Sequence, residues 1–201
     1  MILYFDKDGN LNCFIHIPKN VGKYIRNKIN SSKTNTVVSN FWGIENNIDK
    51  AHIPFMMASE YIKDLNDLDV HFYSFSRNPY DRIISAFLYK YGSRRTPQEF
   101  RRFCADKLIK YKFTEIFKKE IIHYYPQYLF LSDKNESRLN ATIMVKQIED
   151  FNETDFFLKT YDMYYYYDSK TLEIINEIYS LDFELFNYPK KQLFCGIFLN
   201  I

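Results

Sequence analysis

Hydrophobic and polar positions near the start of the chain alternate first as in a strand and then as in a helix. Leu11 to Ile17 is mostly apolar and rich in β-formers, as is typical of a buried strand. The turn Pro18 to Gly22 follows, and Lys23 to Ile29 then places its apolar residues at helical spacing. The pattern predicts a strand, a glycine-containing turn and a helix.

A second unit of the same kind lies further along the chain. Val70 to Ser76 has the composition of a strand, although its alternation is imperfect. Asn78 is a good helix N-cap and Pro79 a good first helical residue, and an apolar stripe continues to about Tyr91. We therefore expect a strand that leads almost directly into a helix.

The other segments complete an alternating order of strands and helices. We expect two more strands, at Asn35 to Ser39 and Ile143 to Ile148. We expect further helices at Pro54 to Leu65, Thr96 to about Leu108, Thr114 to His123, Glu153 to Leu158 and Leu172 to Tyr179. Phe41 to Ala51 looks irregular, and Pro126 to Leu131 is ambiguous. This order predicts one α/β domain over residues 1–201, a three-layer sandwich with a mostly parallel central sheet.

Composition and charge narrow the class of protein. The 201 residues are 46% hydrophobic and 26% charged, which is ordinary for a soluble chain, and the net charge of +2 does not favour nucleic-acid binding. Three widely separated cysteines have no metal-type spacing. We see no signal peptide and no membrane-spanning run, so we expect a soluble, cytoplasmic protein. The oligomeric state is left open.

The turn Pro18 to Gly22 is a candidate anion site. Ligands of α/β proteins bind beyond the carboxyl ends of strands, where a helix N-terminus offers free N–H groups and partial positive charge. Lys19 and Lys23 flank the turn, which suits a phosphate. An ordinary surface turn with two lysines explains the same residues, and this alternative stays open.

Comparison with the Walker A loop argues against an ordinary ATPase or GTPase. Gly22 and Lys23 occupy the Gly-Lys position of that motif. Tyr24 stands where the motif has the Ser or Thr that binds Mg²⁺, and Ile17 stands where it has its first glycine.

A second candidate anion site follows the second predicted strand. Arg77 lies at the strand end, and Ser85 lies two turns into the next helix. A guanidinium can fork onto a phosphate to which a serine hydroxyl also donates. Alternatively, Arg77 and Arg82 form ordinary ion pairs with Asp81 or Glu99.

Together these segments resemble the sulfotransferases of the carbohydrate, Golgi-membrane type. FIHIPKNVGKY, residues 14–24, resembles their FIHIPKTAGTS segment. FSRNPYDRIISAFLY, residues 75–89, resembles their second signature, an Arg followed by x-Pro-Tyr-x-Arg and by a Ser eight residues after the first Arg. Weaker matches are His123 to Gln127 (H-x-x-P-Q), Gln147 to Phe151, and Ile178 to Phe186 (Y-x-x-D-F-x-x-F). The resemblance covers about residues 11–188.

The resemblance implies a P-loop nucleotide-kinase-like fold, the donor 3′-phosphoadenosine-5′-phosphosulfate (PAPS), and no metal. Arg77 and Ser85 would hold the 3′-phosphate. The 5′-phosphosulfate would lie on Lys19, Asn20, Val21, Gly22, Lys23 and Tyr24. The family has a Thr at the position of Asn20 and a Thr-Ser pair at Lys23-Tyr24. These departures leave donor affinity, and therefore activity, open.

The implied reaction is in-line sulfuryl transfer to a hydroxyl or amine of a glycan or another acceptor, leaving the product PAP. Lys19 would stabilise charge on the leaving group. His52 resembles the catalytic histidine in the G-H-x-x-F segment of uronosyl sulfotransferases, and Glu45 is the rival base by analogy with members that use a Glu. His52 could instead cap the helix expected at Pro54. His123 and Gln127 would line the acceptor side.

Two other functions stay open from the sequence. One is a nucleotide or small-molecule kinase of related fold, which the tyrosine at position 24 disfavours. The other is a catalytically inactive nucleotide-binding homologue. Since Golgi enzymes of animals carry a membrane anchor, a chain without one favours a microbial or viral homologue.

Overall fold

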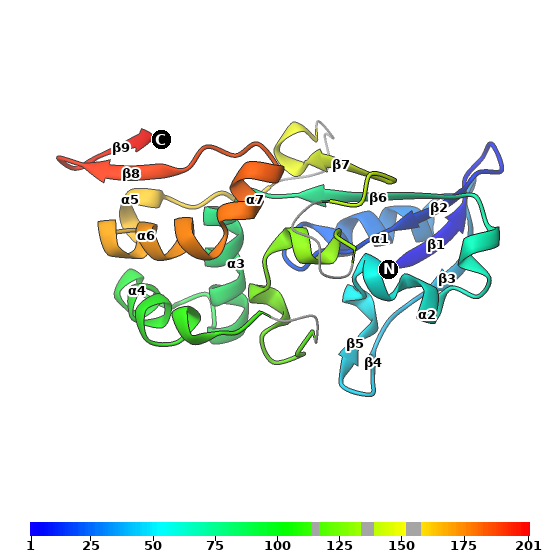
Figure 1. Cartoon of the computed structure of the whole chain (residues 1–201), viewed down its shortest axis with the longest axis horizontal. Helices are drawn as coiled ribbons and strands as arrows, with labels where there is room; N and C mark the ends of the chain where they lie inside the picture. Colours follow the sequence, from blue (N-terminus) through cyan, green and yellow to red (C-terminus); the bar gives the residue numbers. More distant parts are fainter. Residues whose placement is uncertain (114–116, 134–138, 152–157) are drawn as a thin grey trace.

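A five-stranded mixed β-sheet with strand order β3-β1-β2-β6-β7 organises the fold (Figure 1). The computed structural model describes residues 1–113, 117–133, 139–151 and 158–201. Its strands are β1 Ile2–Phe5, β2 Leu11–Phe14, β3 Thr36–Asn40, β4 Ile44–Glu45, β5 Ile48–Asp49, β6 Val70–Ser76, β7 Ile143–Gln147, β8 Lys191–Phe194 and β9 Ile197–Asn200. Its α-helices are α1 Gly22–Ser31, α2 Ala58–Tyr61, α3 Pro79–Tyr91, α4 Pro97–Asp106, α5 Met163–Tyr166, α6 Ser169–Ile178 and α7 Ser180–Leu185.

The predicted α/β class is confirmed, but the sheet is mixed rather than mostly parallel. β2, β6 and β7 run parallel to one another, whereas β1 pairs antiparallel with both β2 and β3. β1 was not predicted from the sequence. The turn between β1 and β2, in which Asp6 accepts hydrogen bonds from the amides of Asp8 (2.9 Å) and Asn10 (3.0 Å), is too short for a parallel crossover.

Alternation along β2 sends its side chains to opposite faces of the sheet. Phe14 joins a hydrophobic cluster with Ile25 and Ile29 of α1. Cys13 joins a larger cluster, which includes Ile83 of α3. Buried side chains therefore pack against both faces of the sheet.

The larger hydrophobic cluster continues into a helical region beyond the sheet. In Figure 1, β6 runs from the sheet towards α3, α6 and α7, and α4 lies at the lower left. Two buried tyrosines in this region bind backbone carbonyls: the Tyr179 hydroxyl donates to Tyr124 O at 2.6 Å and the Tyr167 hydroxyl to Tyr80 O at 2.8 Å. Burial of these aromatic rings therefore leaves their hydroxyl groups satisfied.

The two strongest helix starts in the sequence are confirmed. The Asn78 side chain accepts from the amide of Tyr80 at 3.0 Å, and Pro79 is the first residue of α3. Thr96 and Glu99 form a capping box at the start of α4. Both signals are local, which explains why the sequence alone could locate them.

Several expected elements differ from the structure. The helix expected at Pro54 to Leu65 is broken into the 3₁₀ turn Phe55–Met57, α2, and the 3₁₀ turn Leu65–Asp67, because Ile62 is extended and buried and Asp64 has φ 54°. Phe41 to Ala51 is not irregular but contains the β4–β5 hairpin.

Further differences lie in the second half of the chain. Of the helix expected at Thr114 to His123, residues 114–116 lie outside the described residues and the rest contains only the 3₁₀ turn Ile122–Tyr124. Residues 153–157 of the helix expected at Glu153 to Leu158 also lie outside them, and Leu158 is not helical. The helix expected to start at Leu172 begins earlier, at Ser169, with Asp168 as its cap.

In the described ranges, no helix is both long and apolar enough to cross a membrane.

Candidate functional site

The two segments singled out in the sequence meet at one edge of the sheet. β2 and β6 are adjacent and parallel, with Phe14 opposite Tyr73. Pro18 to Val21 follows β2, and Arg77 follows β6 directly. Because parallel neighbours end at the same edge, the candidate anion sites lie side by side beyond their carboxyl ends.

The loop before α1 has strained backbone geometry. Lys19 (φ 69°) and Val21 (φ 52°) are left-handed, a region that β-branched residues such as valine rarely occupy. Gly22 begins α1 directly beneath the His16 imidazole, since a Cβ at Gly22 would lie 1.7 Å from His16 Cδ2. The glycine is therefore required by a neighbouring side chain.

Asn20 anchors this loop in the protein interior. Its Nδ2 donates to Phe75 O at 2.7 Å and to Gln127 Oε1 at 2.6 Å. A threonine, which the resembling family has here, carries one donor and could make only one of these bonds. The departure at position 20 therefore has a structural reason.

Gln127, predicted to line the acceptor side, is fully buried and joins three segments. Its Oε1 also accepts from the amide of Arg77 at 2.9 Å, and its Nε2 donates to Arg77 O at 2.8 Å. Asp182 accepts from the backbone amides of Gln127 (2.8 Å) and Tyr128 (2.9 Å). Burial raises the pKa of Asp182 to about 6, although nearby Arg82 and these amides favour the carboxylate. The Gln127 amide thus holds the two loops in register.

Arg77 and Arg82 are buried against backbone carbonyls of the same loop. Arg77 Nη1 donates to Lys19 O at 3.0 Å and its Nη2 to Lys159 O. Arg82 donates through Nε to Pro18 O at 3.1 Å and through Nη2 to Tyr125 O at 2.7 Å.

The alternative that these arginines form ion pairs with Asp81 or Glu99 is wrong. Glu99 pairs instead with Arg95, and neither Arg77 nor Arg82 has an ion pair with any described residue. Arg77 Nε and Arg82 Nη1 are buried without a hydrogen-bond partner among the described residues. Two guanidinium nitrogens are therefore left without an acceptor in the described part of the chain.

Lys19 adds a third cation to this cluster. Its Nζ lies 4.3 Å from the centre of the Tyr89 ring, a cation–π contact. Burial, together with repulsion from Arg77 and Arg82, lowers the pKa of Lys19 to about 8. Burial also lowers the pKa values of both arginines. A positive cluster in which two of the three cations are buried is unfavourable unless an anion offsets it.

Three histidines line up beside the cation cluster. The ring centroids of His16 and His52 are 4.3 Å apart, those of His52 and His123 are 5.7 Å apart, and Tyr89 lies 4.8 Å from His123. Burial lowers the pKa values of His52 and His123 to about 3, so both rings are neutral at pH 7.

His52 is oriented by one backbone contact. Its Nδ1 is 2.8 Å from the carbonyl oxygen of His16. Because a carbonyl only accepts, Nδ1 carries the proton and Nε2 is left with a free lone pair. The alternative that His52 caps the helix expected at Pro54 is wrong, since its ring nitrogen is bound to His16.

The other predicted site residues differ from one another in burial and in contacts. Glu45 is exposed on the β4–β5 hairpin, which projects from the lower side of the molecule in Figure 1, and pairs with Lys50 at 2.9 Å. Lys23 is exposed, and the Tyr24 ring packs against Phe151 at 6.4 Å. Ser85 is half-buried on α3 and makes no side-chain hydrogen bond within the described residues.

Sequence reasoning missed Arg82 and Asp182 as parts of the site. Arg82 was quoted within the second signature but was assigned only a possible surface ion pair. Asp182 was quoted within the C-terminal match without a role. The spacing of these two residues within the quoted matches could have pointed to them. Their burial could not be foreseen, because it depends on contacts with residues 41 to 64 positions away in sequence.

Comparisons of the chain with protein-family models, with curated proteins and with solved structures found no match. The sulfotransferase resemblance therefore stays a prediction that rests on the quoted segments.

Proposed function

We propose that this chain is a PAPS-dependent sulfotransferase of P-loop nucleotide-kinase-like fold, which transfers a sulfuryl group to a hydroxyl or amine of a glycan or another acceptor. The observation that carries the proposal is the cluster that half-buried Lys19 forms with buried Arg77 and Arg82 beyond the ends of β2 and β6. These cations have no ion pair with any described residue, so an anionic donor would offset them.

A second line of support is that the segments of the resemblance contact one another. The hydroxyl of Tyr179 donates to Tyr124 O at 2.6 Å, and Glu149 Oε1 accepts from the amide of Asn78 at 2.7 Å. Segments far apart in sequence thus converge on one edge of the sheet: residues 14–24, 75–89, 123–127, 147–151 and 178–186.

In this proposal the two ends of the donor occupy the neighbouring loops. The amides at the start of α1, with Lys19 and Lys23, bind the 5′-phosphosulfate. Arg77 binds the 3′-phosphate through its unpaired Nε, and Ser85 donates its hydroxyl to the same group. Because protein cations offset the phosphate charges, the proposal requires no metal.

Lys19 acts on the leaving group. In-line transfer forms a bond from the acceptor oxygen to sulfur and breaks the bond from sulfur to the bridging oxygen of PAP. Negative charge then builds on the 5′-phosphate, and the Lys19 ammonium donates to it. With a pKa of about 8, Lys19 is charged at pH 7 and is a stronger acid than an exposed lysine.

His52 is the proposed base because its free Nε2 can take the acceptor proton. Its pKa of about 3 makes it a weak base while the site is empty. The negative charge of bound PAPS stabilises the imidazolium and raises that pKa towards neutrality. Glu45, the rival base, is exposed and paired with Lys50. His123 lies beside His52 on the acceptor side.

A second candidate, a catalytically inactive nucleotide-binding homologue, is favoured by one observation. At the position of the family's Thr-Ser pair, Lys23 is exposed and the Tyr24 ring packs on Phe151. The hydroxyl pair of the family is therefore not reproduced at the helix start.

Calorimetric titration with PAP, AMP and magnesium ATP tests donor binding. We expect PAP to bind about tenfold or more tightly than AMP, since the 3′-phosphate gains a charge-assisted contact worth about 1.5–3 kcal/mol. Arg77→Met should remove this difference, and Arg94→Met, at an exposed position outside the site, should keep it. Equal affinity for PAP and AMP would sink the proposal, and preference for magnesium ATP would favour a kinase.

Transfer of radiolabelled sulfate from PAPS to a panel of hydroxyl and amine acceptors tests turnover. His52→Ala should lower the rate about a hundredfold or more and leave PAP affinity intact. His71→Ala is the control, because His71 is exposed on β6. PAP binding without turnover on any acceptor would favour the inactive homologue.

A further inference from the structure

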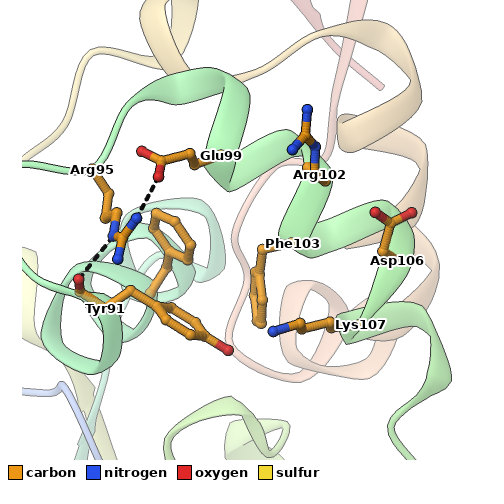
Figure 2. Close-up of a pocket in the computed structure, with 8 residues that line it drawn as sticks. Tyr91, Arg95, Glu99, Arg102, Phe103, Asp106 and Lys107 are labelled. Carbon is orange, nitrogen blue, oxygen red and sulfur yellow. Dashed lines mark hydrogen bonds and ion pairs between the residues drawn. The ribbon is translucent and has the colours of Figure 1, made fainter.

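A cavity of about 380 Å³ lies between α3 and α4, apart from the proposed donor site (Figure 2). Its α3 wall comes from Phe87 and Tyr91, whereas Tyr89 contacts Lys19. Because successive helical residues turn by about 100°, Tyr89 points away from the side that carries Phe87 and Tyr91. The cavity therefore opens on the opposite side of α3 from the cation cluster.

Three aromatic rings form the floor of this cavity. The ring centroids of Phe87 and Phe103 are 5.3 Å apart, those of Tyr91 and Phe103 are 5.6 Å apart, and those of Phe87 and Tyr91 are 5.2 Å apart. Figure 2 shows Tyr91 and Phe103 pointing towards one another from the two helices. Phe87 and Phe103 are almost fully buried, so half-buried Tyr91 offers a ligand most of the ring surface here, and a flat ring can stack on such a surface or meet it edge-on.

The rim of the cavity carries positive charge that the protein does not neutralise. Arg95 is committed to Glu99 and to Tyr91 O at 2.9 Å. Lys107 Nζ lies 5.4 Å from the centre of the Tyr91 ring and has no carboxylate partner among the described residues.

Arg102 extends the positive rim. It has no ion pair in the described part of the chain, although Asp106 lies four residues further along α4. The two positive charges of Arg102 and Lys107 exceed the single negative charge of Asp106. An anion is therefore attracted to the rim, while a cation is repelled by it.

We propose that this cavity binds a small aromatic anion, one or two fused rings that carry a carboxylate, sulfonate, sulfate ester or phosphate ester. The ligand ring lies against Tyr91, above the more deeply buried Phe87 and Phe103, and the anionic group lies beside the Lys107 ammonium. The volume suits a ligand of this size. The site is independent of the proposed sulfotransferase function, because it shares no lining residue with the donor site.

Binding of 2-naphthalenesulfonate to the full-length chain, followed by calorimetry and by ligand-detected NMR, tests this site. We expect 2-naphthol, which has the same rings and is neutral at pH 7, to bind about tenfold more weakly. Lys107→Gln should weaken sulfonate binding about fivefold to tenfold and leave naphthol binding unchanged. Lys110→Gln, which removes the same charge from an exposed position outside the cavity, should change neither.

Three outcomes would overturn the proposal. Equal affinity for the sulfonate and the naphthol would mean that the hollow is ordinary apolar surface. Equal effects of the variants at positions 107 and 110 would mean that the anion responds only to overall charge. Saturating sulfonate should also leave PAP affinity unchanged, and competition between the two would place the sulfonate in the donor site instead.

Discussion

Gly22 shows how one residue of a phosphate-loop-like motif can have a structural task. The Cβ of an alanine at this position would lie 1.7 Å from His16 Cδ2 and 1.9 Å from its Nε2. The imidazole is buried between Phe14 and His52 and has little room to move. The first turn of α1 and the histidine row therefore depend on each other.

Gly22→Ala should lower the free energy of unfolding by about 1–3 kcal/mol, because the ring or the helix must shift. Urea denaturation measures this loss. At an unhindered helix position the same change would stabilise the protein. Lys23→Ala, at the next and exposed residue, is the control and should stay within about 0.5 kcal/mol of the unchanged chain. A neutral or stabilising Gly22→Ala would contradict the packing of His16.

At the scale of residues, the sequence identified the loops that carry Lys19 and Arg77 but not the side chains that hold these loops in place. Lys19 and Arg77 could be found because strand ends before helices are recognisable from local patterns. The bonds of Gln127 to Asn20 and Arg77, which join residues 107 and 50 positions apart, could not. Glu45 was chosen by analogy with the resembling family, and in the structure it is exposed and pairs with Lys50.

At the scale of elements, one buried side chain fastens α3 to the rest of the site. Arg82 is fully buried and donates to Pro18 O before α1, and to Tyr125 O after the 3₁₀ turn Ile122–Tyr124. Without the guanidinium, both carbonyls would lose a charge-assisted bond inside the protein.

Arg82→Met should therefore lower the free energy of unfolding by about 2–4 kcal/mol. Arg82→Lys keeps the charge but lacks the planar fork, so it should rescue only part of the loss. Urea midpoints measure both, with Arg102→Met on the exposed face of α4 as the control. If Arg82→Met were as stable as the control, the bonds of the arginine would not be what holds α3 to the two loops.

The elements found from sequence are those with local signals. Asn78 with Pro79 and Thr96 with Pro97 mark the starts of α3 and α4, and both are where the sequence put them. β1 was missed because its place in the sheet is set by pairing with β2 and β3 and not by its own four residues. The β4–β5 hairpin was missed because its strands have two residues each.

For the whole molecule, the cation cluster lies where the sheet and the helical region meet. Lys19 belongs to the loop after β2, Arg77 follows β6, and Arg82 belongs to α3. Carboxylates nearby are occupied by backbone amides: Asp81 accepts from Tyr161 N at 2.8 Å, and Asp182 accepts from Gln127 N at 2.8 Å. An anion bound here would touch several elements at once and should stabilise the entire fold.

The stabilisation by PAP should depend on pH through Lys19. The empty site holds the Lys19 pKa at about 8, so below that pH the ammonium is already formed and PAP binds it without taking up a proton. Above that pH binding must recharge the lysine, and affinity should fall by up to about tenfold per pH unit. His52 and His123, with pKa values of about 3, stay neutral throughout this range.

Thermal unfolding with and without PAP, from about pH 7 to about pH 9.5, measures this dependence; the PAP phosphates are ionised across that range. The rise in Tm should be constant up to about pH 8 and then shrink. In Lys19→Met the rise in Tm should be smaller and independent of pH, because the titrating group is gone. The control Lys33→Met, at an exposed position, should behave like the unchanged chain. An undiminished rise at high pH, or the same decline in Lys19→Met, would show that Lys19 does not face the bound anion.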